Sequence, residues 1–153
     1  MAPDIIVTGI IVTLTILTGL YALYKKRQRD NAWKSFPAWW TMKGEAPPMT
    51  GVALDIIKQN TPGMKYYGSI EWVKGPFMDG LSSQLLAGLV QSFYPPTIKL
   101  MYFEKVEQSA LAHEIGHVWR AQTDRAGTEP AADPEFAKWL ADVNAQIAKA
   151  VGR

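Results

Sequence analysis

The chain of 153 residues contains no cysteine. Disulfide bonds, thiolate metal sites and a cysteine nucleophile are therefore excluded, so any metal ion must be bound by histidine and carboxylate side chains. The chain also has only two histidines, no internal repeat and no low-complexity tract. With 48% hydrophobic, 11% aromatic and 20% charged residues, the composition excludes wholesale disorder. The length allows one domain, or a small domain with an appendage.

Most of the chain lacks an excess of basic charge, although the formal net charge is +2. Up to Lys43 there are six Lys/Arg and two Asp, which gives a balance of +4. The remaining residues contain ten Lys/Arg and twelve Asp/Glu, which gives −2. A mildly acidic region without a basic patch does not have the electrostatic footprint of a nucleic-acid-binding protein. We therefore expect no nucleic-acid partner.

One segment near the N-terminus lacks charge entirely. The twenty residues from Ile5 to Tyr24 contain no Asp, Glu, Lys or Arg, and as an α-helix they span roughly 30 Å, the thickness of the bilayer hydrocarbon. A buried core helix would need a larger protein around it, and a signal peptide would have a basic start and a shorter apolar run. We predict a transmembrane anchor over residues 1–24, with the lipid bilayer as its partner.

Basic residues follow this segment directly and none precedes it: Lys25, Lys26, Arg27 and Arg29. The positive-inside rule then predicts a single-pass topology with the N-terminus outside and the C-terminal domain in the cytoplasm. Aromatic and lysine residues alternate next, which is typical either of the headgroup region or of a protein core: Trp33, Lys34, Phe36, Trp39, Trp40 and Lys43. We predict that residues 25–48 form a basic and aromatic juxtamembrane segment, ending in a linker over 44–48.

Residues 49–153 are predicted to form one small α+β domain. Strands are expected over 65–73 and 97–103, which are rich in aromatic and β-branched residues. Helices are expected over 52–59, 79–93, 105–122 and from Pro134 onward. Leucines at helical spacing support the second helix. An Asp133 N-cap followed by a proline, and a long apolar stripe, support the last helix.

The two histidines are His113 and His117, and Glu114 lies between them. On a helix, residues four apart share a face, so the two imidazoles can converge on one Zn²⁺. Glu114 then projects slightly to the side, where a carboxylate can accept a proton from water activated by the metal. The surrounding positions from 110 to 119 are otherwise uncharged, which predicts a largely buried helix and favours a metal site over two unrelated surface histidines.

These ten residues, Ala110 to Trp119, resemble the extended HExxH motif of the zincin metallopeptidases. The resemblance implies a zincin-like domain, a Zn²⁺ cofactor and a peptide or protein substrate. It also implies a strand above the active-site helix that pairs with an extended peptide, and residues 97–103 are expected to be that strand. The layout of the resemblance extends over about Lys65–Arg153, but only the ten residues are specific to the family.

The third ligand decides the subclass. Metzincins need a glycine and a further ligand where this chain has Arg120 and Thr123, so that class is excluded. With no third histidine, a carboxylate is expected, as in the gluzincins. Glu129 begins Glu-Pro-Ala-Ala-Asp, which resembles the gluzincin Glu-x-x-Ala-Asp signature. In that signature the aspartate, here Asp133, orients a zinc-binding histidine.

Two other acids remain open as the third ligand. Glu135 has a sequence separation from His117 that resembles the gluzincins better, and Asp124 is a third choice. We favour Glu129, so the predicted metal ligands are His113, His117 and Glu129.

The predicted function is that of a membrane-anchored zinc metallopeptidase in which Glu114 is the general base. Tyr102, Arg120 or Arg125 would have to stabilise the oxyanion. The alternative is a structural or assembly protein of a membrane complex, or of a membrane-containing virion, in which a zincin-like domain performs no chemistry. Its partners would be other proteins of that membrane complex. A lipid-binding module built on the basic aromatic segment is a third hypothesis.

Overall fold

The computed structural model describes residues 3–33, 36–80, 82–125 and 127–152. The chain divides into two compact units, Met1–Phe36 and Pro37–Arg153. Each unit is considered by itself below.

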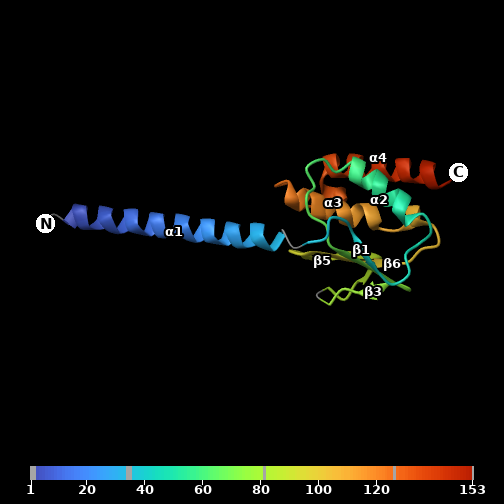
Figure 1. Cartoon of the computed structure of the whole chain (residues 1–153), viewed down its shortest axis with the longest axis horizontal. Helices are drawn as coiled ribbons and strands as arrows, with labels where there is room; N and C mark the ends of the chain where they lie inside the picture. The colour runs from blue at the N-terminus through green and yellow to red at the C-terminus, as the bar shows by residue number, and fades with distance from the viewer. Residues whose placement is uncertain (1–2, 34–35, 81, 126, 153) are drawn as a thin grey trace. The chain divides into compact units, whose positions relative to one another are not determined.

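The first unit consists of α1 (Pro3–Trp33), labelled in Figure 1. Its stretch Asp4–Gln28 is long and apolar enough to cross a membrane by length and composition, and its apolar side chains are exposed. The hydroxyls of four threonines each donate to the backbone carbonyl four residues earlier, at 2.8–2.9 Å: Thr8, Thr13, Thr15 and Thr18. These bonds satisfy the polar groups that would otherwise oppose burial in hydrocarbon. The helix is longer than predicted, because it continues past Tyr24 through the basic residues.

The second unit is built on a four-stranded mixed sheet in the order β1-β2-β6-β5. Its strands are β1 (Thr41–Lys43), β2 (Ser69–Val73), β6 (Pro96–Met101) and β5 (Gly88–Phe93). The first three run parallel, and β5 is antiparallel to β6. A separate two-stranded hairpin, β3 (Phe77–Met78) and β4 (Leu85–Leu86), precedes β5. The fold is therefore α+β with a small sheet, as predicted.

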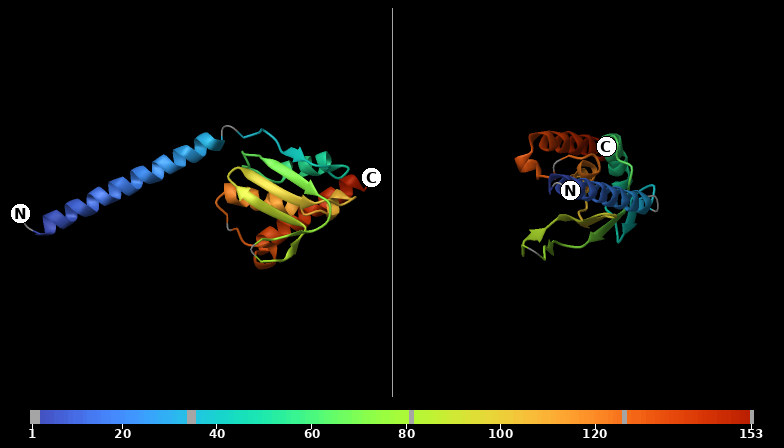
Figure 2. Two further views of the ribbon diagram at one scale, coloured as in Figure 1. Left: turned by 90° about the horizontal axis from the view of Figure 1, so that it is seen from below. Right: turned by 90° about the vertical axis from the view of Figure 1, so that its left-hand side faces the viewer.

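Three helices cover one face of this sheet (Figures 1 and 2): α2 (Thr50–Gln59), α3 (Leu111–Gln122) and α4 (Pro134–Val151). Helix α3 contacts β5, β6 and α4, and α2 packs against α4. Short 3-10 turns precede α3 and α4, at Val106–Gln108 and Pro130–Ala132. Helix α3 therefore lies between the sheet and α4, with one face toward each.

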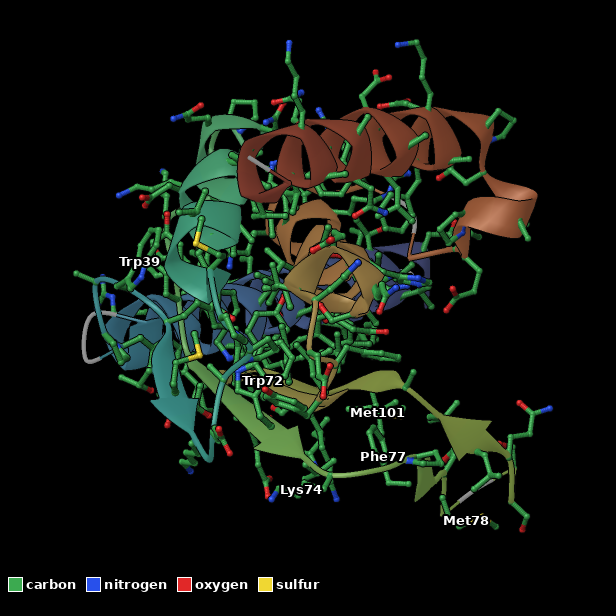
Figure 3. All side chains as sticks on the ribbon, turned by 90° about the vertical axis from the view of Figure 1, so that its right-hand side faces the viewer. Trp39, Trp72, Lys74, Phe77, Met78 and Met101 are labelled. Carbon is green, nitrogen blue, oxygen red and sulfur yellow. The ribbon has the colours of Figure 1, made fainter. Side chains whose placement is uncertain are left out.

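The core fills the space between the two layers (Figure 3). Its fully buried side chains come from both layers and include Ile57, Ile70, Ile98, Leu100, Leu111, Ile115, Phe136 and Val143. Burial of each such side chain contributes about 1.5–3 kcal/mol. Alternate residues of β6 are buried, which is the pattern of a strand with one face on a core.

The prediction of a helix over 79–93 is wrong. A tight turn, in which Ser83 N–H donates to the Asp79 carbonyl at 2.9 Å, closes the β3–β4 hairpin instead. The rest of the segment becomes β5, whose ladder with β6 supplies its backbone hydrogen bonds. The leucine spacing in residues 79–93 is a local pattern, and the pairing of β5 with β6 overrides it. Exposed Met78, labelled in Figure 3, belongs to this hairpin.

The folded unit begins at Pro37, whereas the sequence placed the domain boundary at residue 49. Within the predicted juxtamembrane segment, β1 pairs with β2, and Trp40 is buried in the core, edge-on to the Tyr67 ring. Trp39 packs against the same core. Of the two readings of the aromatic residues, the core reading therefore holds for Trp39 and Trp40. Lys34, and the side chain of Trp33, lie outside the described residues.

The last helix begins as predicted. Pro134 is its first residue, and the carboxylate of Asp133 accepts a hydrogen bond from Phe136 N–H at 3.2 Å. This N-cap satisfies one of the otherwise unpaired amides of the first turn. The helix expected over 105–122 is shorter, because regular α-helix starts at Leu111 after the 3-10 turn.

Candidate metal centre

Helix α3 presents His113 and His117 on one face, as their spacing of four residues predicts. Their Nε2 atoms lie 3.1 Å apart, with ring centroids separated by 5.0 Å. The His117 side chain is 9% exposed and that of His113 is 31% exposed. The pair thus forms a partly buried site with one open side.

The carboxylate of Glu129 completes this group. Its Oε2 lies 2.9 Å from His113 Nε2, and its Oε1 lies 3.3 Å from His117 Nε2. Glu129 comes directly before the 3-10 turn Pro130–Ala132, so a loop and not the following helix presents it. In the gluzincins the glutamate ligand comes from a following helix, so the element that carries Glu129 differs from the one that the resemblance implies.

The two imidazoles and the Glu129 carboxylate lie close enough together to hold a zinc ion. At Zn–N and Zn–O distances of about 2.05 Å, adjacent ligands of a tetrahedral ion lie about 3.3 Å apart. The two Nε2 atoms are 3.1 Å apart, and each has a Glu129 oxygen within a few tenths of an ångström of that value, Oε2 at 2.9 Å from His113 and Oε1 at 3.3 Å from His117. Two imidazoles and a carboxylate are also a donor set that zinc accepts.

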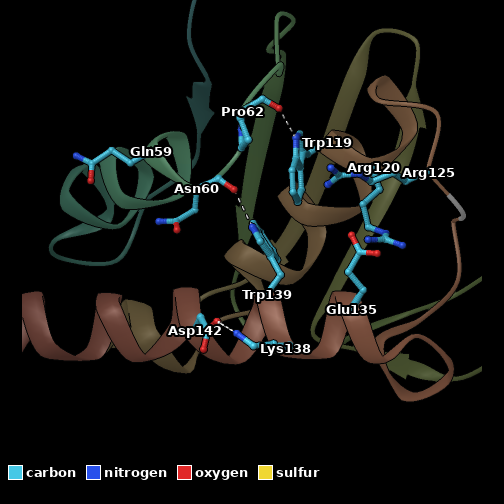
Figure 4. A pocket seen from close by; sticks show the side chains of 10 residues that line it. All are labelled: Gln59, Asn60, Pro62, Trp119, Arg120, Arg125, Glu135, Lys138, Trp139 and Asp142. Carbon is cyan, nitrogen blue, oxygen red and sulfur yellow. Dashed lines mark hydrogen bonds and ion pairs between the residues drawn. The ribbon is translucent and has the colours of Figure 1, made fainter.

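The other two candidate ligands lie elsewhere. Within the described part of the chain, the group that can hold a metal comprises both histidines and Glu129, and neither Glu135 nor Asp124 belongs to it. Glu135 instead helps line a pocket of about 490 Å³ between α2, α3 and α4 (Figure 4). Trp119 and Trp139 also line this pocket. Asp124 is exposed just after α3.

Glu114 lies beneath β5 and is only 8% exposed. Its carboxylate accepts a hydrogen bond from Val90 N–H, and its Cγ would lie 3.0 Å from a Cβ at Gly88. A larger residue at Gly88 would therefore displace the carboxylate. Burial, together with the negative charge of Glu129, raises the pKa of Glu114 to about 7, against the lowering effect of the Val90 hydrogen bond.

Gly88 was not singled out by the sequence analysis. An isolated glycine within the apolar run Leu85–Val90 was the available signal, because such glycines mark a close backbone approach.

Phe136 of α4 packs against both imidazoles. Its ring lies edge-on to His113 and His117, with centroid distances of 6.0 and 5.1 Å. Gly116 allows this approach, because a Cβ there would lie 2.6 Å from the Phe136 ring. Burial lowers the pKa of His117, partly offset by the charge of Glu129. A lowered pKa favours the neutral imidazole, which is the form that binds metals.

Asp133 does not have the role that the resemblance implies. Its carboxylate accepts hydrogen bonds from Arg120, Thr128 Oγ1 and Phe136 N–H, and none of these three partners is a histidine. Phe136 N–H, with Arg120 and Thr128, holds the pKa of Asp133 below its usual range.

The three residues proposed to stabilise an oxyanion have different surroundings. Arg120 is buried in its pair with Asp133, and the Arg125 guanidinium stacks on the Trp119 ring at 4.3 Å. Tyr102 follows β6, where its N–H donates to the Val73 carbonyl at 2.7 Å.

The strand beside the site is also different from the one expected. Residues 97–103 were predicted to pair with a substrate, but β6 is flanked by β2 and β5 on its two sides. Strand β5 forms one edge of the sheet, opposite β1, and it contacts α3. An edge strand presents unpaired backbone groups, whereas β6 is paired on both sides.

Comparisons with protein-family models, with curated proteins and with solved structures found no match to this chain. The zincin resemblance thus depends on residues 110–119 and on the geometry described above.

Proposed function

We propose that this chain is a membrane-anchored zinc metallopeptidase that hydrolyses peptide bonds. The observation that carries the proposal is the convergence of His113, His117 and Glu129 into a group that could hold a metal ion, next to the buried Glu114. Structural zinc sites usually have four protein ligands, whereas catalytic sites have three and leave one position open. Three ligands with one open side favour the catalytic class.

A zinc ion bound by these residues supplies Lewis acidity and lowers the pKa of water to about 7. Glu114 then acts as the general base that accepts the proton of the attacking water and delivers it to the leaving amine. In the metal-free site, burial and the charge of Glu129 raise the pKa of Glu114 to about 7, so its carboxyl group can exchange a proton near neutral pH. Val90 N–H fixes the carboxylate in place.

The outer edge of β5 is the proposed binding site for the substrate backbone. Because β5 both forms the edge of the sheet and donates to Glu114 through Val90, a peptide added as a further strand would run beside the catalytic groups. Alternate residues of such a peptide would face α3.

The apolar helix α1 supports a membrane location. We propose that it crosses the bilayer with its basic C-terminal end in the cytoplasm, so the second unit acts on substrates at that surface. The folded unit begins a few residues after α1 ends, which restricts its substrates to proteins close to the membrane.

Activity and metal content test the proposal on the full chain in detergent micelles. We expect about one zinc per chain, lost in His113→Ala, and peptide hydrolysis that is abolished in Glu114→Gln while zinc remains bound. Glu135→Gln is the matched control, because this acid lies outside the metal group, and it should retain both. Hydrolysis by Glu114→Gln at the wild-type rate would refute the role of Glu114, and absence of zinc from the wild type would refute the metal site.

A non-catalytic structural or assembly protein of a membrane complex is the second candidate. It is favoured by one observation, namely that Arg120 and Arg125 are already engaged with Asp133 and Trp119. A chain that binds zinc stoichiometrically and hydrolyses no peptide would select this alternative.

A further inference from the structure

One carboxylate joins both ends of the segment that carries Glu129. Asp133 Oδ2 accepts hydrogen bonds from Arg120 Nη2 on α3 and, at 3.3 Å, from Thr128 Oγ1. Asp133 Oδ1 caps α4 through Phe136 N–H. Thr128 directly precedes Glu129, and Asp133 follows it by four residues. The segment is therefore closed into a loop and fixed to both helices.

The contacts of the Glu129 side chain described here are those with the two histidines. Its side chain is 67% exposed, so its position depends on its backbone. That backbone forms a tight turn, in which Ala132 N–H donates to the Glu129 carbonyl at 2.9 Å and Asp133 N–H donates to the Pro130 carbonyl at 3.2 Å. The position of the Glu129 carboxylate therefore depends on where this turn places Asp133.

Arg120 connects this loop to the histidine helix. It lies on α3 one turn after His117, and its side chain is only 5% exposed. Its guanidinium carbon lies 5.0 Å from the centre of the Phe136 ring, which packs against both imidazoles. A buried guanidinium–carboxylate pair is directional, because the planar donor fork fixes the orientation of its partner.

We propose that Arg120 and Asp133 form a positioning pair that holds the third metal ligand, Glu129, at the two histidines. The inference rests on the proposed metal site and adds a role that the zincin signature does not give to its aspartate. Asp133 acts on the loop that carries a ligand, through an arginine on α3, and not directly on a histidine. Without the pair, the loop carrying Glu129 separates from α3, and the metal keeps two protein ligands.

The alternative is an ion pair that only stabilises the fold. A double-mutant cycle separates the two, because a pair that acts through Glu129 has no effect on metal affinity once Glu129 is gone. The experiment measures Zn²⁺ affinity by competition with a chromophoric chelator, on the full chain in detergent micelles. The variants are Arg120→Met, Arg120→Lys and Asp133→Asn, each with Glu129 present and with Glu129→Ala.

With Glu129 present, we expect Arg120→Met and Asp133→Asn to weaken zinc binding about 10- to 100-fold, the usual effect of losing an outer-shell partner. Arg120→Lys should retain part of the affinity, because it keeps the charge but not the fork. In the Glu129→Ala background, Arg120→Met should cause no further loss. The visible spectrum of the Co²⁺-loaded Arg120→Met protein should match that of Glu129→Ala. Lys138→Met is the control, because it removes the exposed ion pair with Asp142 on α4, and it should bind zinc as the wild type does.

Wild-type affinity in folded Arg120→Met and Asp133→Asn would overturn the positioning role while leaving the metal site intact. Equal losses in the two backgrounds would also overturn it, because the pair would then act on the histidines or on the fold. If Arg120→Met does not fold, Asp133→Asn, which keeps a good N-cap, and Thr128→Val decide the question. A wild type that binds no zinc would overturn the proposed function as well, and only that result affects both.

Discussion

Glu114→Gln should make the metal-free protein more stable at high pH, although it removes the proposed catalytic base. Burial and the charge of Glu129 raise the pKa of Glu114 from an ordinary 4.5 to about 7. Between these two values, the folded protein binds more protons than the unfolded chain does. The free energy of unfolding therefore falls as pH rises through this window, and the full penalty is present above pH 7.

The size of the effect follows from the shift in pKa. At 1.36 kcal/mol for each pKa unit, a rise from 4.5 to about 7 corresponds to about 3 kcal/mol. Glutamine has the shape of the neutral acid and can still accept the hydrogen bond from Val90 N–H, but it carries no charge. We expect Glu114→Gln to exceed the wild type by about 3 kcal/mol at pH 8 and to equal it near pH 4.

Urea titrations followed by tryptophan fluorescence measure this difference, on the full chain in micelles with a chelator present. His117, whose pKa is lowered by burial, is present in both proteins and affects both curves. Glu135→Gln is the control and should follow the wild type at every pH. A difference between Glu114→Gln and wild type that is the same at pH 4 and pH 8 would refute the reasoning, because the buried charge would then carry no cost.

Two further predictions concern the packing of the second unit. Gly116→Ala places a Cβ 2.6 Å from the Phe136 ring. It should therefore destabilise the unit by about 1–3 kcal/mol, as overpacking does, and weaken zinc binding. Unchanged urea midpoints and an unchanged zinc affinity would contradict this prediction. A chain of residues 37–153 should fold and show a cooperative thermal transition, whereas 49–153, which lacks β1 and the buried Trp40, should not. Cooperative unfolding of the shorter chain would show that the folded unit begins at residue 49 after all.

The sequence predicted the elements whose signals are local. The cap at Asp133, the HExxH helix and the apolar stripe of α4 each depend on residues within a few positions of one another, and the structure has all three. The helix over 79–93 failed because its alternative, β5, depends on pairing with β6. The boundary at residue 49 failed for the same reason, since Trp40 becomes core only when β1 pairs with β2.

The third ligand shows the same limit within the site. Its separation from His117 favoured Glu135, and the resemblance of Glu129–Asp133 to the gluzincin signature favoured Glu129. Pro134 begins α4, and the 3-10 turn before it directs Glu129 toward the histidines. The contact that holds this turn, between Arg120 and Asp133, joins α3 to the cap of α4. A periodic pattern within one helix cannot predict a contact between two helices.

The charges of the site favour a divalent cation over an empty state. The lowered pKa of His117 favours its neutral form, so it cannot offset the negative charges of Glu129 and Glu114. Burial, and after it the negative charge of Glu129, raises the pKa of Glu114, so ionising this carboxyl group has a cost in the metal-free protein. A dication bound at the two histidines and Glu129 would offset the part of this cost that comes from the charge of Glu129, and at 1,000 times its dissociation constant it would add about 4 kcal/mol of stability. The charge of Glu129, which makes the ionised form of Glu114 less favourable in the metal-free site, is therefore also a source of affinity for the metal.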